Sequence, residues 1–291
     1  MSDVIGPFGP ARQVASMSSD HIKAMYRHKC GVEIDMSAAT DGLVQLFECQ
    51  ATGYRFWRPI ELAGDEEFYQ KLDLNWPNYY QRRRWEYSFA LSAIKGCSSF
   101  LEIGCGRGFF LRSTEGHVTQ AHGLEFNKDA IKNKVTNWDI SHKTIEELAE
   151  KQSSAFDAIS AFQVLEHVID PNEFLRACLN ALRPGGQLIM STPNPNYVPH
   201  QLRQDAFDLP PHHMGQFSHD TYRRLAQHLG LDIVAIHVQP RTARGEDVNL
   251  ATKRSAVYKI ARAIGYLPMN IAYWLNEEPG PNILAIFRKP E

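Results

Sequence analysis

Three glycines at alternate positions follow a carboxylate in the stretch FLEIGCGRGFFL, residues 100–111. A short apolar run ends at Glu102, and Gly104, Gly106 and Gly108 come next, before a second apolar run begins. This order predicts a strand, a glycine loop and a helix. Glycine has no Cβ, so a ligand can approach the backbone of such a loop closely. The dinucleotide fingerprint G-x-G-x-x-G places its third glycine one residue later, which argues against a nicotinamide dehydrogenase.

A second acid stands at the end of the next predicted strand. The segment VTQAHGLEF, residues 118–126, places Glu125 at the strand tip. A carboxylate in that position of a nucleotide-binding α/β fold can accept hydrogen bonds from both ribose hydroxyls. Asn127 is a suitable N-cap for a predicted helix over residues 128–135.

The pattern E-x-G-x-G-x-G and the segments after it resemble the class I S-adenosylmethionine-dependent methyltransferases. The further matching segments, in chain order, are residues 118–126, 155–162, 163–168, 181–194 and 282–290. The resemblance covers about residues 85–240 and the last strand. It implies an α/β fold with a Rossmann-like, seven-stranded, mostly parallel sheet and helices on both faces.

The resemblance also implies S-adenosylmethionine as the cofactor. Glu102 would then lie near the methionine ammonium, Glu125 would hold the ribose, and the loop over residues 141–145 would flank the adenine. The alternatives are that Glu102 only caps backbone amides and that Glu125 is an exposed strand-end carboxylate. The residues expected at the cofactor are Glu102, Gly104, Cys105, Gly106, Gly108, Glu125, Phe126, Ile145, Phe162 and Gln163.

The pattern Q-x-x-E-H at residues 163–167 resembles the E-x-x-E-H of metal-assisted relatives, namely small-RNA and quinone O-methyltransferases. In those relatives two glutamates and a histidine bind a divalent ion, with a further histidine after strand five. The ligands here would be Glu166, His167 and His213. Gln163 replaces the first carboxylate with a weaker neutral ligand, so the sequence predicts no metal.

His212 and His213 are the predicted general bases, with His167 as a further catalytic candidate. They follow two prolines in LPPHHMGQFS, residues 209–218, and those prolines stiffen the approach. Imidazole titrates near neutral pH, so it can take a hydroxyl proton as the methyl group moves. The alternative is a purely structural role for one of the two. Tyr197 is expected to line the acceptor pocket.

The N-terminal region, residues 1–64, is predicted to be a tail over residues 1 to about 20 and then a small β-module. It resembles the degenerate zinc-ribbon-like start of some sugar and small-molecule methyltransferases. A ribbon needs C-x2-C twice, whereas Cys30 and Cys49 stand alone and Thr52 takes the place of a partner cysteine. Even with His21 and His28 nearby, zinc is not expected.

The remaining chain divides into a helical, cofactor-covering segment at residues 65–95 and a core at residues 96–291. The run Arg82 to Arg84 is interpreted as a solvated helix face. A helical insertion at about residues 252–276 is predicted to pack on the core or to cover the substrate. Contact with a membrane surface is the alternative, because basic residues flank its apolar face.

Composition limits the partners. The 291 residues carry 31 Lys and Arg against 33 Asp and Glu, a net charge of −2, so no nucleic-acid partner is expected. Five cysteines without paired spacing favour reduced thiols in the cytoplasm. The first residues lack the apolar core of a signal peptide, and no apolar run reaches the about 18 residues of a membrane span.

The sequence therefore predicts a methyltransferase acting on a hydroxyl of a sugar, glycan or small metabolite. N-methylation of an amino sugar or small amine is the alternative within the class. A module that binds the cofactor or a partner without turnover is an alternative outside it. The sequence identifies neither the acceptor nor the oligomeric state.

Overall fold

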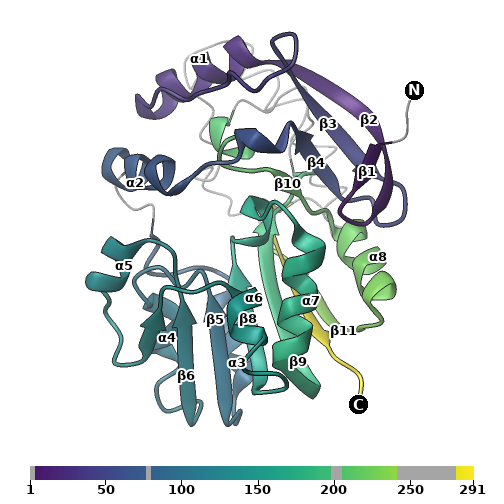
Figure 1. Cartoon of the computed structure of the whole chain (residues 1–291). Coiled ribbons are helices and arrows are strands. Elements are labelled where there is room, and N and C mark those ends of the chain that lie inside the picture. The colour runs from purple at the N-terminus through teal and green to yellow at the C-terminus, as the bar shows by residue number, and fades with distance from the viewer. Residues whose placement is uncertain (1–3, 77–79, 198–204, 241–279) are drawn as a thin grey trace.

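The structure is a computed structural model that describes residues 4–76, 80–197, 205–240 and 280–291. Two sheets organise these residues, and the smaller sheet lies above the larger one in Figure 1. The helical insertion predicted at about residues 252–276 lies outside the described residues. Within the described part, no helix is both long enough and apolar enough to cross a membrane.

The larger sheet has seven strands in the order β11-β12-β9-β8-β5-β6-β7. Their bounds are β5 (Ser99–Ile103), β6 (Gln120–Leu124), β7 (Asp139–Ser141), β8 (Phe156–Phe162), β9 (Leu182–Pro193), β11 (Asp232–Val238) and β12 (Asn282–Arg288). β5 to β9 pair in parallel, and β12 runs antiparallel to both β9 and β11. The predicted seven-stranded, mostly parallel sheet is confirmed.

Helices connect these strands, as a parallel sheet requires. They are α3 (Tyr87–Ile94), α4 (Phe109–Ser113), α5 (Lys128–Lys132), α6 (Ile145–Ala149), α7 (Pro171–Ala181) and α8 (His219–Leu229). Asn127 is the N-cap of α5, since its side chain accepts the N–H groups of Asp129 and Ala130. The helix ends at Lys132, short of the predicted residue 135, because the Val135 N–H donates to the Arg107 carbonyl instead.

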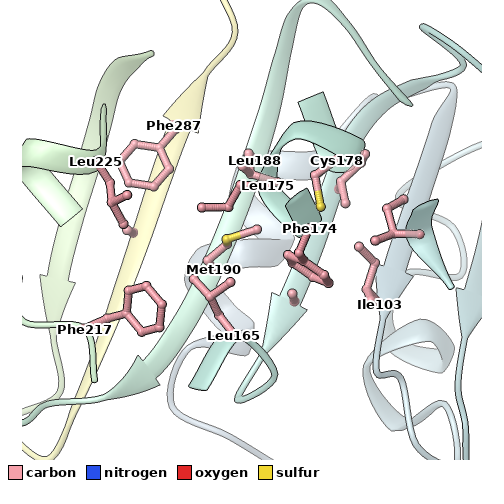
Figure 2. Packing of buried hydrophobic residues seen from close by; sticks show 14 of the residues in the cluster. Ile103, Leu165, Phe174, Leu175, Cys178, Leu188, Met190, Phe217, Leu225 and Phe287 are labelled. Atoms are coloured by element: carbon pink, nitrogen blue, oxygen red, sulfur yellow. The ribbon is translucent and has the colours of Figure 1, made fainter. Parts of the chain in front are cut away.

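The core of this layer lies between α7 and the sheet. Figure 2 shows Phe174, Leu175 and Cys178 of α7 beside Leu188 and Met190 of β9, and all five side chains are buried. Burying one such side chain contributes about 1.5–3 kcal/mol, so this contact fixes the helix on the sheet. The carboxyl ends of the central strands are thereby held at one edge, where ligands bind in open α/β sheets.

The smaller sheet has the strand order β1-β2-β3-β4-β10. Its elements are β1 (Val4–Gly6), β2 (Gly9–Ser18), β3 (Leu43–Cys49), β4 (Arg55–Arg58) and β10 (Gly215–Gln216), with α1 (Ser19–Cys30), a 3-10 helix at Ile60–Leu62 and α2 (Glu66–Asn75) beside them. The prediction of a tail is wrong for residues 4–18. Glycine and proline there form a hairpin turn, and β2 pairs with β3 from Ala11 to Ser18.

The segment predicted to be helical over residues 65–95 is only partly so. It contains α2 and α3, and residues 80–86 between them are not helical. The smaller sheet takes its last strand, β10, from the segment LPPHHMGQFS, far along the chain. The Trp57 N–H donates to the Met214 carbonyl, and the Met214 N–H donates to the Glu166 carbonyl. The two sheets are therefore joined at the predicted catalytic residues.

Candidate active site

The glycine loop connects β5 to α4 with a left-handed backbone. Gly104 and Gly106 have φ angles of +66° and +54°, which residues with a Cβ rarely adopt. A Cβ on Gly104 would lie 2.4 Å from the Val164 side chain, and one on Gly106 would lie 2.6 Å from the Tyr80 ring. Glycine is therefore required here for its conformation and for the close approach of neighbouring side chains.

Glu125 follows β6 and closes over this loop. Its carboxylate accepts the Gly106 N–H at 2.7 Å and the Asn127 N–H at 2.8 Å. The side chain is 9% exposed, and burial raises the pKa of its carboxyl above the ordinary value. A carboxylate has about four acceptor sites, so lone pairs remain for a hydroxyl donor such as that of a ribose.

Glu102, at the end of β5, is also buried. Its carboxylate accepts the Leu111 N–H at 3.1 Å, and burial raises the pKa of its carboxyl well above the ordinary value. This contact agrees with the alternative for Glu102 stated above, in which its carboxylate caps backbone amides. Glu102 therefore ties the first turn of α4 to the end of β5.

The other residues expected at the cofactor differ in exposure. Phe126 is 57% exposed, and its ring meets the edge of the His142 ring. Cys105, Ile145 and Phe162 are buried, and their side chains belong to the hydrophobic core. Any contribution of these three to the cofactor site would come mainly through their backbone and through the shape of the core.

The segment before the glycine loop covers it from the side of α2. Asn127 donates from its side-chain amide to the Tyr80 hydroxyl at 3.0 Å, so Tyr80 is held above Gly106. The Arg84 side chain is 21% exposed and lies 4.0 Å from the buried Glu86 carboxylate. The interpretation of Arg82 to Arg84 as a solvated face is therefore wrong for Arg84. The pattern of apolar residues in the sequence does not distinguish Arg84 from Arg82 and Arg83.

Gln163 directly follows β8 with a φ of +55°, unusual for a residue other than glycine. Its backbone N–H donates to the Ser191 carbonyl at 2.8 Å, and its side-chain amide lies 3.4 Å from the Ser191 hydroxyl. That hydroxyl donates to Glu86 at 3.1 Å. Gln163 is thus tied to β9 through Ser191.

His167, His212 and His213, which we call the histidine cluster, come together from two segments. His167 ends the 3-10 helix at Leu165–His167, and the other two belong to the Pro-Pro-His-His element. The ring centroid of His167 lies 4.5 Å from that of His212 and 4.9 Å from that of His213. The structure therefore brings the three predicted catalytic histidines together.

Hydrogen bonds orient the first two imidazoles. The Nδ1 atom of His167 lies 2.6 Å from the His212 carbonyl, and Nδ1 of His212 lies 3.0 Å from the Phe207 carbonyl. A carbonyl only accepts, so these two contacts favour the tautomers in which Nδ1 carries the proton. Burial lowers the pKa of His167 to about 4 and that of His212 well below the ordinary value.

Carboxyl groups surround His213. Its Nδ1 lies 3.6 Å from Asp208, and its Nε2 lies 3.9 Å from Glu166. Glu166 is 1% exposed, and neither carboxyl oxygen has a hydrogen-bond partner among the described residues. Burial raises the pKa of this carboxyl to about 8.

Two tyrosines that no sequence motif marks, one on α1 and one on α2, support the cluster. The Tyr26 hydroxyl of α1 donates to the Leu209 carbonyl at 2.8 Å and accepts the His212 N–H at 3.2 Å. The Tyr69 hydroxyl of α2 lies 3.1 Å from Nδ1 of His167. Helices α1 and α2 therefore position the histidines, and only the tertiary placement of these two tyrosines reveals their role.

Comparison with known proteins identifies the family. A family model described as a methyltransferase domain matches residues 77–236. The chain belongs to this methyltransferase domain family. A crystal structure of an S-adenosylmethionine-dependent methyltransferase from Archaeoglobus fulgidus superimposes with a TM-score of 0.54 at 20% identity, covering 70% of this chain and 91% of that one. The prediction of a methyltransferase is confirmed, and the superposition shows the same fold.

Curated relatives of this methyltransferase include proteins named ubiquinone biosynthesis O-methyltransferase. One from Chromobacterium violaceum is 26% identical over 206 residues, which cover 66% of this chain and 78% of the relative. One from Xanthomonas oryzae is 33% identical over 101 residues, or 32% of this chain. That match spans only 42% of the relative's length. The family model begins at residue 77, so strands β1 to β4 of the smaller sheet lie outside it.

The zinc-ribbon resemblance finds no support in the N-terminal sheet. Cys49 is buried in β3 and its thiol donates to the Phe8 carbonyl, while the Cys30 thiol donates to the Tyr26 carbonyl. Their thiols therefore make ordinary backbone contacts in the module.

Proposed function

We propose that this protein transfers a methyl group from S-adenosylmethionine to a hydroxyl of a small molecule. The observation that carries the proposal is the adjacency of two groups of residues. Val164 packs on the glycine loop at Gly104 and lies in the same turn as Glu166 and His167. A cofactor held by the loop and by Glu125 would thus present its methyl group toward the histidine cluster.

The chemistry requires little more than this placement. The sulfonium is already an activated electrophile, so the protein must align the acceptor with the methyl–sulfur bond and exclude water. A hydroxyl must also lose its proton as the methyl group moves. The histidine cluster can promote that loss in two ways: a neutral imidazole can accept the proton, or a cation held by the imidazoles can lower the pKa of the hydroxyl.

Oxygen is the better acceptor atom for this site. A neutral amine attacks the methyl group without a general base, so an amine acceptor would not need the histidine cluster. The names of the curated relatives also refer to O-methylation. N-methylation of an amino sugar or small amine remains the alternative.

The acceptor class that we propose is a hydroxyl of a sugar, a glycan or a small metabolite. A phenolic hydroxyl of a quinone precursor is a second candidate, because the relatives are named for ubiquinone biosynthesis. We also propose a cytoplasmic location, supported by free thiols at all five cysteines.

The test is a methyl-transfer screen. Purified protein is incubated with isotope-labelled S-adenosylmethionine and four acceptor panels: sugar nucleotides, glycans, catechols and amines. Formation of S-adenosylhomocysteine together with a methylated hydroxyl product would support the proposal. Transfer only to amines would favour the alternative. Cofactor binding without transfer to any panel would favour a non-catalytic module.

A further inference from the structure

Lys29, in the last turn of α1, is packed against aromatic rings rather than extended into solvent. Its side chain is 16% exposed, and its ammonium lies 4.1 Å from the ring centroid of Phe207 and 5.5 Å from that of Trp76. The two rings meet edge to face at 5.3 Å. An ammonium over an aromatic face is attracted by the ring, and more strongly when water is excluded. Lys29 therefore joins the end of α1 to Phe207 and to Trp76, the C-cap of α2.

The Asp205 carboxylate completes the surroundings of this ammonium. Nζ of Lys29 donates to Oδ1 of Asp205, and the same oxygen accepts the Phe207 N–H at 2.9 Å. Asp205 is thereby the N-cap of the 3-10 helix at Ala206–Asp208. An ion pair that is partly buried and continued by hydrogen bonds holds its geometry better than an exposed pair. Lys29 therefore anchors the start of this short helix to α1.

The short helix supplies contacts that orient the His212 imidazole. The Phe207 carbonyl lies 3.0 Å from Nδ1 of His212 and favours the tautomer that carries its proton there. The Phe207 ring also lies 5.1 Å from the His212 ring, measured between centroids. A displacement of the short helix would therefore change both the orientation and the tautomer of this imidazole.

Helix α1 holds the same segment at a second point. Tyr26 lies three residues before Lys29, hence on the same face of α1, and its hydroxyl donates to the Leu209 carbonyl. The backbone N–H groups of the two adjacent histidines donate to that carbonyl as well, each at 3.1 Å. One face of α1 thus fixes residues 205–213 at their start, through Lys29, and at their middle, through Tyr26.

We propose that Lys29 is a positioning residue for methyl transfer, which acts by holding the His212 imidazole in place through the short helix. Helix α1 lies outside the matched residues 77–236, so this control of the imidazole is additional to the methyltransferase domain. The role of Lys29 in catalysis rests on the function proposed above, whereas its effect on His212 can be measured without cofactor or acceptor.

The first test is nuclear magnetic resonance of the full chain with ¹⁵N-labelled histidine at neutral pH. The ring nitrogen signals report which nitrogen carries the proton, and His212→Ala identifies the His212 signals. Wild type should show the proton on Nδ1. Lys29→Met, which keeps an unbranched side chain but removes the charge, should show a mixture of both tautomers. Lys29→Arg should keep the wild-type signals, because a guanidinium also stacks on aromatic rings and pairs with a carboxylate. Unchanged His212 signals in Lys29→Met would overturn the proposal.

A matched control and a second variant accompany this test. Lys23→Met makes the same change on the same helix, where the ammonium lies 3.5 Å from the exposed Asp20, and should leave the His212 signals unchanged. Circular dichroism melts confirm that each variant is folded. If Lys29→Met does not fold, Asp205→Asn replaces it, since the amide keeps an oxygen for the Phe207 N–H but loses the charge. It should give the same mixture of tautomers, and wild-type signals would overturn the proposal.

The second test is kinetic and uses an acceptor found in the screen above. Lys29→Met should lower kcat by ~10- to 100-fold, as expected for a displaced reacting group, while the dissociation constant of S-adenosylhomocysteine stays within about twofold of wild type. In a His212→Ala background the same change should lower kcat no further. A further loss of equal size would overturn the proposal, because Lys29 would then act elsewhere. A screen without any acceptor would count against the proposed function, and the resonance test would still decide whether Lys29 positions His212.

Discussion

Replacing Glu125 by alanine tests the cofactor site most directly. The carboxylate should accept two hydrogen bonds from the ribose hydroxyls, and hydrogen bonds to a charged group contribute about 1.5–3 kcal/mol each. Their loss corresponds to about 3–6 kcal/mol, or a ~100- to 10,000-fold weaker dissociation constant. We expect the lower end of this range, because the same oxygens also hold Gly106 and Asn127.

The structure adds a second expected effect. The two backbone N–H groups that donate to Glu125 at 2.7 and 2.8 Å would lose their acceptor. An unsatisfied buried donor costs about 1–3 kcal/mol, so the free energy of unfolding should fall even without ligand. The free energy of unfolding of Glu125→Gln should lie between those of wild type and Glu125→Ala. The amide keeps one acceptor oxygen, but its N–H₂ group faces a backbone donor.

The assay is calorimetric titration with S-adenosylhomocysteine, below the melting temperature of each variant. Glu173→Ala, which removes an exposed carboxylate of α7, is the control for charge. A dissociation constant of Glu125→Ala within about twofold of wild type would remove this residue from the cofactor site. A large loss in both variants would indicate a general electrostatic effect instead.

Three further predictions follow from particular contacts. Gly106→Ala should lower cofactor affinity and the melting temperature more than Gly116→Ala, because both glycines have positive φ but only the first would bring a Cβ against Tyr80. Tyr26→Phe removes the hydroxyl that bonds Leu209 and His212, so it should lower the free energy of unfolding by about 1–2 kcal/mol, measured by denaturant titration. It should also reduce the rate of methyl transfer, measured by steady-state kinetics, more than it reduces cofactor affinity. Burial raises the pKa of the Glu86 carboxyl, so its contribution to stability is present at low pH and is lost as pH rises above 4.5. The free energy of unfolding of Glu86→Gln should therefore fall less than that of wild type as pH rises above 4.5. Identical pH profiles of the two proteins would contradict this.

Local sequence patterns were sufficient for the central sheet. The short apolar run that contains Glu102 became β5, because such a segment between polar turns favours a buried strand, and the segment before Glu125 became β6. The cap at Asn127 was equally local, since an N-cap acts within its own helix.

Elements that depend on distant partners were predicted less well. β2 contains few strand-forming residues and is a strand because it pairs with β3. Residues 4–18 therefore appeared to be a tail when considered alone. Arg84 appeared equivalent to its basic neighbours, and only the placement of the buried Glu86 distinguishes it.

The sequence by itself determined the chemistry-bearing residue types and their order along the chain. It placed a glycine loop, a strand-end carboxylate and histidines on successive segments, because each motif is a few residues long and specifies its own backbone. The tertiary structure decided how the histidines relate to one another. His167 lies 45 residues from His212, and the distance between their rings depends on β10 joining the N-terminal sheet and on Tyr26 bonding the His212 amide. Such long-range contacts depend on packing between segments, which no local pattern encodes.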